Sequence, residues 1–490
     1  MSSKTQTGNG AIAYEHSEDH LLEYFSKGGS IKQQQIFYEY IEEDVLGLFK
    51  NAWYTGRQKE CMQLAFWTRD CRGGAGARQN FRDIIKWLAQ NSPEWVMANI
   101  DLIPKYGRWD DLKALYGTPC ESTALAFWGD ALTSDNPDVT PLASKWCDRQ
   151  DYRLRNYLGM SPKAFRKMVS KNSGDIVEKK MCSGTWEDIN FSHVPSVAMS
   201  RYRNAFKKHA TSHFNHWVQE VITGKKKVNV DVLFPHDVVR TAKNCLGAAD
   251  DIKTFEQYID SIFESLPNYI EDPNVRIMPV VDFSGSMTIK TSGSITAMDV
   301  ALGLGLYCSD RVGKDTPFYR KLIPFSSTSK LESWKGMSVF DAIGKLPNGY
   351  CGSTNIKHAL DNLLEAGQFF NATKDQMPTT LLIFSDMQWD AERARNTNSS
   401  YWATTPIDGY DDTTIERCMA KWEAVGYNRP SIVYWNLVGY KNQPSTKREN
   451  NIALVSGFSP SILKTVLTSG ALSPEKVMYD TINRYEVKTP

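Results

Sequence analysis

Long hydrophobic runs are absent from this sequence. No segment of its 490 residues contains the ~18 consecutive apolar residues that a membrane-spanning helix needs. The first ten residues are polar and lack the apolar centre of a signal peptide. We therefore expect a protein that neither spans a membrane nor enters the secretory route, and we place it in the cytoplasm.

Paired cysteine motifs are also lacking. The nine cysteines are an odd number, and no two of them are separated by only two residues. This spacing is atypical of a disulfide framework or of a cysteine-rich zinc site. It favours free thiols in a reducing compartment, in agreement with a cytoplasmic location.

Charge is nearly balanced over the whole chain but not within it. The formal net charge is +1. Between residues 141 and 227, however, 17 lysines and arginines stand against 7 aspartates and glutamates, a local excess of +10. An excess of this size in one segment indicates an anionic partner.

Two patterns of apolar spacing divide the chain. From residue 19 to residue 266, apolar residues recur every three or four positions, as in 60–67, 81–89 and 255–266, and predict helices joined by short loops. After residue 272, short apolar runs alternate with helical segments, which is typical of a parallel sheet covered by helices. We expect stacked, HEAT-like helical repeats followed by an α/β domain, with the boundary near Asp272.

Five apolar runs are the candidate strands of the α/β domain. They lie at residues 276–281, 321–325, 379–385, 431–437 and 452–455, with candidate helices at 295–309, 355–366, 413–425 and 460–467. Several strands are continuously apolar, as expected where helices cover both faces of a sheet.

Oxygen-bearing side chains follow two of these strands. Asp282, Ser284 and Ser286 occupy alternate positions after the first strand, Thr354 precedes a predicted helix, and Asp386 follows the third strand. Open α/β sheets bind ligands at the carboxyl ends of their strands, so we expect these oxygens at one edge. Hard oxygen ligands suit Mg²⁺, Mn²⁺ or Ca²⁺ and disfavour Zn²⁺. The sequence therefore predicts one divalent-cation site.

The order and spacing of these five residues resemble the metal-ion-dependent adhesion site of von Willebrand factor A (vWA) domains. In that family the matching Asp, two Ser, Thr and second Asp hold the cation directly or through water. One coordination position stays open for an acidic group from a partner. The resemblance implies a Rossmann-like vWA domain over residues 273–490, with Mg²⁺ as the first candidate cation and a protein partner that supplies a carboxylate.

Two unusual phrases lie in the helical half. Residues 69–78 read RDCRGGAGAR and residues 106–112 read YGRWDDL. They resemble a family known mainly as a domain of unknown function in plants, bacteria and large viruses, over roughly residues 35 to 470. The layout is also similar to that of TROVE-module (Ro ribonucleoprotein-like) proteins, whose helical repeats bind small structured RNAs and single-stranded ends. This similarity implies a TROVE-like domain over residues 19–272, after a flexible N-terminus at 1–18.

The basic segment supplies the candidate RNA-binding residues. Cations alternate there with aromatic residues, which suits a surface that follows a nucleic-acid backbone and stacks on bases. The candidates are Arg149, Arg153, Arg155, Arg166, Lys167, Arg201, Arg203, Lys207 and Lys208. In the alternative interpretation, many of the aromatics are core residues, and arginines such as Arg69 and Arg108 pair with nearby aspartates to brace helix junctions.

Catalytic patterns are scarce. The glycine-rich residues 72–78 lack the Gly-Lys-Ser/Thr ending of a P-loop. His209, His213 and His216 have a helical spacing that zinc could use, but without a nearby fourth ligand a polar stripe is the preferred interpretation. We predict a non-catalytic scaffold that binds RNA through its helical domain and docks a protein through a divalent cation. The alternatives are a protein-binding or virion-associated component with no nucleic-acid role and, third, a metal-assisted hydrolase.

Overall fold

A computed structural model describes residues 4–6, 12–15, 17–29, 45–174, 176–228, 230, 233–244, 252–272, 274–292, 295–325, 330–346, 356–387, 414–438, 444, 451–468 and 472–490. No helix in this part of the chain combines the length and the apolar character that crossing a bilayer requires.

Helices dominate the N-terminal half, as the sequence predicts. In the described residues they are α1 (His20–Gly28), α2 (Val45–Trp53), α3 (Gln58–Arg69), α4 (Arg78–Asn91), α5 (Pro93–Ala98), α6 (Leu102–Tyr106), α7 (Glu121–Thr133), α8 (Thr140–Lys145), α9 (Tyr152–Tyr157), α10 (Pro162–Asn172), α11 (Val177–Ser183), α12 (Ser196–His209), α13 (Thr211–Ile222), α14 (Pro235–Lys243) and α15 (Ile252–Ser265). Three 3₁₀ helices lie among them: η1 (Trp109–Leu115), η2 (Trp186–Asp188) and η3 (Phe191–His193). Two short strands, β1 (Lys4–Gln6) and β2 (Ile12–Tyr14), pair antiparallel ahead of α1.

Side-chain caps explain where several helices begin. The Asp19 carboxylate accepts hydrogen bonds from the backbone N–H groups of Leu21 and Leu22 at the start of α1. Asp151 caps α9 in the same way, and Ser161 caps α10. Such caps satisfy N–H groups that have no partner within the helix, and each stabilises its helix by about 1 kcal/mol.

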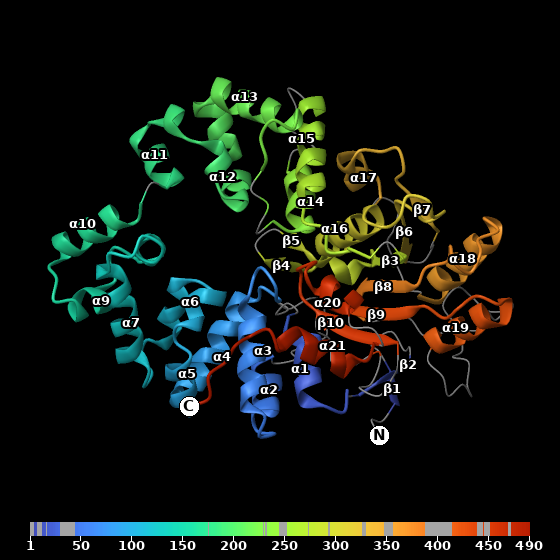
Figure 1. The fold of residues 1–490 in the computed structure, drawn as a ribbon, viewed down its shortest axis with the longest axis horizontal. Helices are drawn as coiled ribbons and strands as arrows, with labels where there is room; N and C mark the ends of the chain where they lie inside the picture. The colour runs from blue at the N-terminus through green and yellow to red at the C-terminus, as the bar shows by residue number, and fades with distance from the viewer. Residues whose placement is uncertain are drawn as a thin grey trace, which may run out of the picture.

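The helices follow a curved path (Figure 1). From α7 the chain runs through α9, α10 and α11 to α12 and α13, and it then returns through α14 and α15 to the sheet. At one end of the helical half α1 packs against strand β10 (Ile452–Ser456), and at the other end α14 packs against helix α16 (Ala297–Asp310). The helical half is thus anchored on the α/β half at both ends.

The C-terminal half contains a mixed, mostly parallel sheet, which confirms the predicted α/β architecture. In the described residues, six strands pair in the order β10-β9-β8-β3-β6-β7. The parallel members are β3 (Ile277–Asp282), β6 (Lys321–Phe325), β8 (Thr380–Ser385), β9 (Ser431–Asn436) and β10, and β7 (Glu332–Ser333) pairs antiparallel with β6. All five predicted strands are found within one residue of their expected bounds.

The four predicted helices are present, three of them between strands and the last one after β10. They are α16, α18 (Ile356–Phe369), α19 (Thr414–Val425) and α20 (Ile462–Thr468). The structure adds elements that the sequence did not predict, among them β7, α17 (Val339–Lys345), α21 (Pro474–Ile482) and a small hairpin of β4 (Lys290–Ser292) and β5 (Ile295–Thr296).

Two glycines in α16 let this helix lie close to both halves of the molecule. A Cβ atom on Gly305 would lie 2.7 Å from Cγ2 of Val281 in β3. A Cβ atom on Gly303 would lie 2.7 Å from the backbone nitrogen of His236 in α14. Both approaches are too short for a larger residue, so these glycines allow the close packing.

The C-terminal residues return to the helical half. The side-chain amide of Asn99 and the backbone of Lys488 exchange two hydrogen bonds of 2.8 Å. The buried Tyr485 donates its hydroxyl proton to the Asp70 carboxylate at 3.1 Å, and its carbonyl accepts from the Gln63 amide at 3.1 Å. These bonds tie the end of the chain to α3 and its neighbours.

Candidate metal centre

The turn after β3 holds three oxygen-bearing side chains together. Asp282 is the last residue of β3, and Ser284 and Ser286 lie at the start of the 3₁₀ helix η4 (Gly285–Thr288). Asp282 Oδ1 accepts from the Ser284 N–H at 2.9 Å, and Asp282 Oδ2 accepts from the Ser385 hydroxyl at 2.7 Å. The hydroxyl oxygens of Ser284 and Ser286 are 3.0 Å apart.

Asp386 lies on the neighbouring strand end. In the parallel β3–β8 pair Val281 is opposite Phe384, so Asp282 and Ser385 stand at the same level and Asp386 is one residue further along. Both aspartates are fully buried. Met387 adopts a φ of 64°, and its N–H donates to the Ser385 hydroxyl at 2.9 Å. This left-handed residue turns the chain directly after Asp386.

The sheet topology explains why these residues meet. From β3 the chain moves outward to β6 and β7, and it then crosses to β8 on the other side of β3. The edge between the ends of β3 and β8 is therefore the switch point of the sheet, the usual ligand position in open α/β folds. Asp282 and Asp386 come from the two strands that flank it.

Burial of these carboxylates has an electrostatic cost. Burial raises the pKa of Asp282 above its usual value, and the negative charge of Asp386 raises it further, whereas hydrogen bonds from Ser284 and Ser385 lower it. Two buried like charges are costly unless a proton or a cation compensates them. A divalent cation is one group that would let both carboxylates ionise.

Four of the five predicted ligands, Asp282, Ser284, Ser286 and Asp386, lie at this edge. The fifth, Thr354, lies outside the described residues, two positions before α18 begins. The four placed side chains offer carboxylate and hydroxyl oxygens only, a set that fits Mg²⁺, Mn²⁺ or Ca²⁺. Their role as cation ligands stays a prediction.

The three histidines do not share one helix. His209 ends α12, and Ala210, with a φ of −132°, separates it from α13, which carries His213 and His216. The His209 ring stacks on Trp186 with 4.6 Å between ring centroids. Across the described ranges no group of three or more His, Cys, Asp or Glu side chains is arranged to hold a metal ion. The prediction that one helical face carries all three histidines is therefore wrong.

The two unusual phrases of the helical half meet in one ion-pair network. The buried Asp111 carboxylate accepts from Arg69 Nε at 2.6 Å and from Arg82 Nε at 2.7 Å. The neighbouring Asp110 pairs with Arg108 at 2.6 Å and with Arg82 at 3.0 Å. These arginines brace the junction of α3, α4 and η1. The predicted pairing with a nearby aspartate is confirmed for Arg108 and wrong for Arg69, whose partner Asp111 lies 42 positions away.

The glycine-rich turn between α3 and α4 serves close packing. A Cβ atom on Gly74 would lie 2.1 Å from the Trp67 carbonyl oxygen. Ala75 approaches Gly457, which follows β10 and has a φ of 105°. The Arg484 guanidinium donates to the Gly73 carbonyl at 3.3 Å. The turn therefore joins the helical half to the end of β10.

The candidate RNA-binding cations divide into two groups. Six are exposed: Arg149, Arg166, Lys167, Arg201, Lys207 and Lys208. Arg153, Arg155 and Arg203 are half-buried. Arg153 pairs with Glu121 at 2.5 Å, and the Arg203 guanidinium carbon lies 3.9 Å from the ring centroid of Phe255. The exposed group is the one that offers its charge to a partner most directly.

The aromatics of the basic segment divide in the same way. Phe165 and Phe206 are fully buried and belong to the core. Tyr152 and Tyr157 in α9 are 57% and 49% exposed. Only part of the expected stacking surface is therefore available on the outside of the helices.

Sequence reasoning missed a cavity of about 430 Å³ between α12, α13 and α15. Arg203 and Lys207 line it from α12, together with Asn215 and Gln219 from α13 and Phe255 from α15. The four-residue spacing of Arg203 and Lys207 places both on one face of α12 and was the available signal. Neither periodicity nor charge predicts that two other helices would close around that face.

Comparison with known proteins gives similarities without an assigned activity. Residues 276–489 match a family model described as "Domain of unknown function (DUF7788)", and residues 132–266 match one described as "Domain of unknown function (DUF2828)". The uncharacterized protein L728 of Acanthamoeba polyphaga mimivirus is 24% identical over 542 residues, which cover 99% of this chain and 88% of that protein. The two family matches meet where the helical half gives way to the sheet.

Proposed function

We propose that this protein is a non-catalytic binding scaffold. In this proposal the α/β half is a vWA domain that docks a protein through a divalent cation, and the helical half, built of HEAT-like repeats, binds RNA. The observation that carries the proposal is the meeting of two buried carboxylates, Asp282 and Asp386, at the switch point of the sheet.

A cation at this edge would be held by Asp282, Ser284, Ser286 and Asp386, with Thr354 as the predicted fifth ligand. The buried aspartates supply negative charge that a cation can balance, and the serine hydroxyls supply neutral oxygens. When bound, the cation supplies a positive charge that attracts an acidic side chain. The similarity of the ligand order to that of vWA domains supports a partner carboxylate in the open position.

The absence of catalysis rests on the surroundings of the two aspartates. No third His, Cys, Asp or Glu joins them in a metal-binding group within the described part of the chain. General base catalysis needs a proton acceptor that is poised near neutral pH beside the reacting group. The described residues offer none apart from the two carboxylates that would be committed to the cation.

RNA binding is supported by the basic segment and by the similarity to TROVE-module proteins. The exposed cations of α10 and α12 and the exposed tyrosines of α9 lie along the curved path of the helices (Figure 1). A protein-binding component without a nucleic-acid role is the second candidate, favoured by the Arg153–Glu121 pair and by the burial of Phe165 and Phe206.

Thermal unfolding in the presence of Mg²⁺ tests the cation part of the proposal. A ligand that binds only the folded state stabilises it by RT ln(1 + [L]/Kd), about 2.7 kcal/mol at one hundred times Kd. We expect Mg²⁺ to raise the melting temperature of the wild type and not that of Asp282→Ala. Turnover of nucleotides or phosphoesters that disappears in Asp386→Ala would overturn the non-catalytic assignment.

A further inference from the structure

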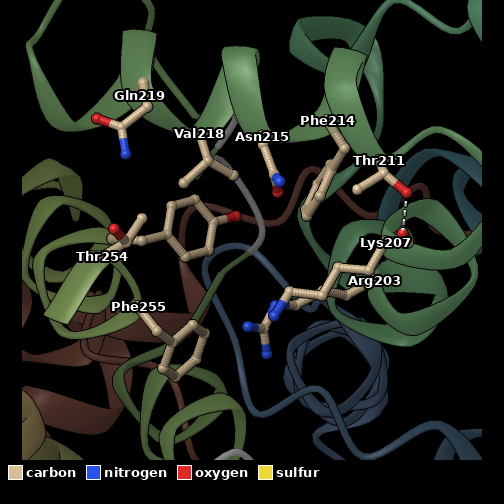
Figure 2. A pocket seen from close by; sticks show the side chains of 10 residues that line it. Arg203, Lys207, Thr211, Phe214, Asn215, Val218, Gln219, Thr254 and Phe255 are labelled. Carbon is tan, nitrogen blue, oxygen red and sulfur yellow. Dashed lines mark hydrogen bonds between the residues drawn. The ribbon is translucent and has the colours of Figure 1, made fainter. Parts of the chain in front are cut away.

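The cavity between α12, α13 and α15 combines three kinds of side chain (Figure 2). Two cationic side chains line it from α12, and two amide side chains line it from α13. Aromatic rings line it from α13 and α15. Its volume of about 430 Å³ is in the range of cavities that bind small ligands. Neither the metal centre nor the ion-pair network uses these residues.

One wall of the cavity is cationic. Arg203 and Lys207 lie one helical turn apart on α12, and both side chains extend toward the space in Figure 2. The Arg203 guanidinium is held 3.9 Å from the ring centroid of Phe255. Lys207 is exposed and makes no ion pair with any residue that the structure describes. A guanidinium whose position is fixed and a neighbouring ammonium group are suited to a phosphate.

The opposite wall carries two side-chain amides that can form hydrogen bonds with the polar edge of a ligand. Asn215 and Gln219 lie four residues apart on α13, and both are exposed. Their side-chain amides make no hydrogen bond to the described residues, and each amide both donates and accepts hydrogen bonds. Such pairs match the edge of a nucleobase, which also presents donors and acceptors side by side. The buried rings of Phe214 and Tyr258 complete the apolar part of the lining.

The mixed lining narrows the class of ligand. An apolar molecule would offer no polar partner to Lys207 or to the two amides of the lining, which is costly for polar groups that the ligand covers. Inorganic phosphate would satisfy the two cations but leave the amides and aromatic rings unused. A ligand with a phosphate at one end and a flat, polar-edged ring at the other uses all three parts.

We propose that this cavity binds a nucleoside 5′-monophosphate unit. The phosphate lies against Arg203 and Lys207, and the base lies against the aromatic part of the lining with its edge toward Asn215 and Gln219. The unit is either one unpaired nucleotide of an RNA strand or a free nucleotide. The first source rests on the RNA binding proposed above, and the second does not.

Calorimetric titration of the full chain with AMP, UMP, adenosine and inorganic phosphate tests the assignment. We expect the wild type to bind a nucleotide more tightly than either adenosine or phosphate. Lys207→Ala should weaken nucleotide binding by about tenfold, the loss expected for one charge-assisted hydrogen bond. The control is Lys86→Ala, which removes the same charge from an exposed residue of α4, outside the cavity lining, and should bind nucleotides like the wild type. Asn215→Ala should weaken nucleotide binding and leave phosphate binding unchanged.

A second arm titrates the same variants with a single-stranded oligoribonucleotide. If RNA binds but nucleotides do not, and Lys207→Ala weakens RNA binding no more than Lys86→Ala does, the cavity assignment is wrong and RNA binding survives. If nucleotides bind with the expected variant effects and RNA does not bind, the cavity assignment is supported and the proposed RNA binding is wrong. Binding of neither ligand contradicts both.

Discussion

The guanidinium of Arg69 lies 2.6 Å from the carboxylate of Asp111, and both side chains are buried. The two residues are 42 positions apart and belong to the two most unusual phrases of the sequence. Because Arg82 also binds Asp111, one buried carboxylate joins α3, α4 and η1. The two phrases thus have a structural role.

Removal of this carboxylate should destabilise the fold strongly. Asp111→Ala leaves the buried Arg69 charge uncompensated, so we expect the free energy of unfolding to fall by about 3–5 kcal/mol. The control is Glu271→Ala, which breaks the exposed pair with Lys464 and should cost at most about 1 kcal/mol. Urea unfolding measures both. Similar losses in the two variants would show that the buried network contributes little.

The glycine-rich turn should reject any side chain at Gly74. A Cβ atom there would overlap the Trp67 carbonyl oxygen at 2.1 Å, and a backbone atom cannot move aside cheaply. We expect Gly74→Ala to cost about 3 kcal/mol, at the upper end for overpacking. Gly313→Ala is the matched control, because nothing lies within 4 Å of the added atom. Equal melting temperatures for the two variants would contradict the packing role of the turn.

The contact between the two halves should depend on pH through His236. Burial lowers the pKa of His236, with a further small lowering from Arg240 that the Asp237 carboxylate opposes. The folded protein therefore keeps this imidazole neutral, while the unfolded chain takes up a proton as the pH falls below about 6.5. The contribution of this group to the free energy of unfolding should be complete above that pH. Below it, the free energy of unfolding should decrease by up to about 1.4 kcal/mol per pH unit from this group.

Two histidine variants isolate this contribution. His236→Gln should flatten the pH dependence of unfolding below pH 6.5, whatever its own stability. His216→Gln, at a side chain that is 75% exposed, should leave the slope unchanged. An identical slope in the wild type and His236→Gln would show that His236 titrates normally in the fold.

RNA affinity should depend on the exposed cations and less on the paired one. Each phosphate contact to a single strand contributes about 0.7 to the slope of log affinity against log salt. We expect Arg166→Ala with Lys167→Ala to lower that slope by about 1.4. Arg153→Ala should change it less, because Glu121 already engages this guanidinium. Gel-shift titrations at several salt concentrations measure the slopes, and Asp282→Ala should behave like the wild type. A slope that the paired substitutions leave unchanged would favour a protein-binding role without nucleic acid.

The sheet was predictable from sequence because its strands are short, apolar and regularly interrupted. Residues 321–325 form β6 as predicted, and the other parallel strands differ by one residue at their ends. Strand β7 was not predicted, because two polar residues carry no periodic pattern. Helix α21 was missed as well, although Ser473 caps it and Pro474 begins it.

The pairing of charges was not predictable in the same way. The sequence suggested that Arg69 pairs with a nearby aspartate, but the fold brings Arg69 to Asp111, 42 positions away. The partner is chosen by how helices pack, which depends on contacts far apart in the chain. The local pattern likewise gave no sign that α12 ends at His209 and that Ala210 redirects the chain before His213. The candidate cation ligands, in contrast, could be selected from the sequence. Their residue types, their order and their positions at strand ends are all local features.

The measurement that tests the central claim most directly is a calorimetric titration of the metal-free protein with Mg²⁺ and Mn²⁺. We expect one cation per chain in the wild type and in Asp341→Ala, whose exposed carboxylate lies on α17. Asp282→Ala and Asp386→Ala should each abolish binding, and Ser284→Ala should weaken it. Binding of equal stoichiometry and affinity to the wild type and Asp282→Ala would contradict the assignment of the cation site.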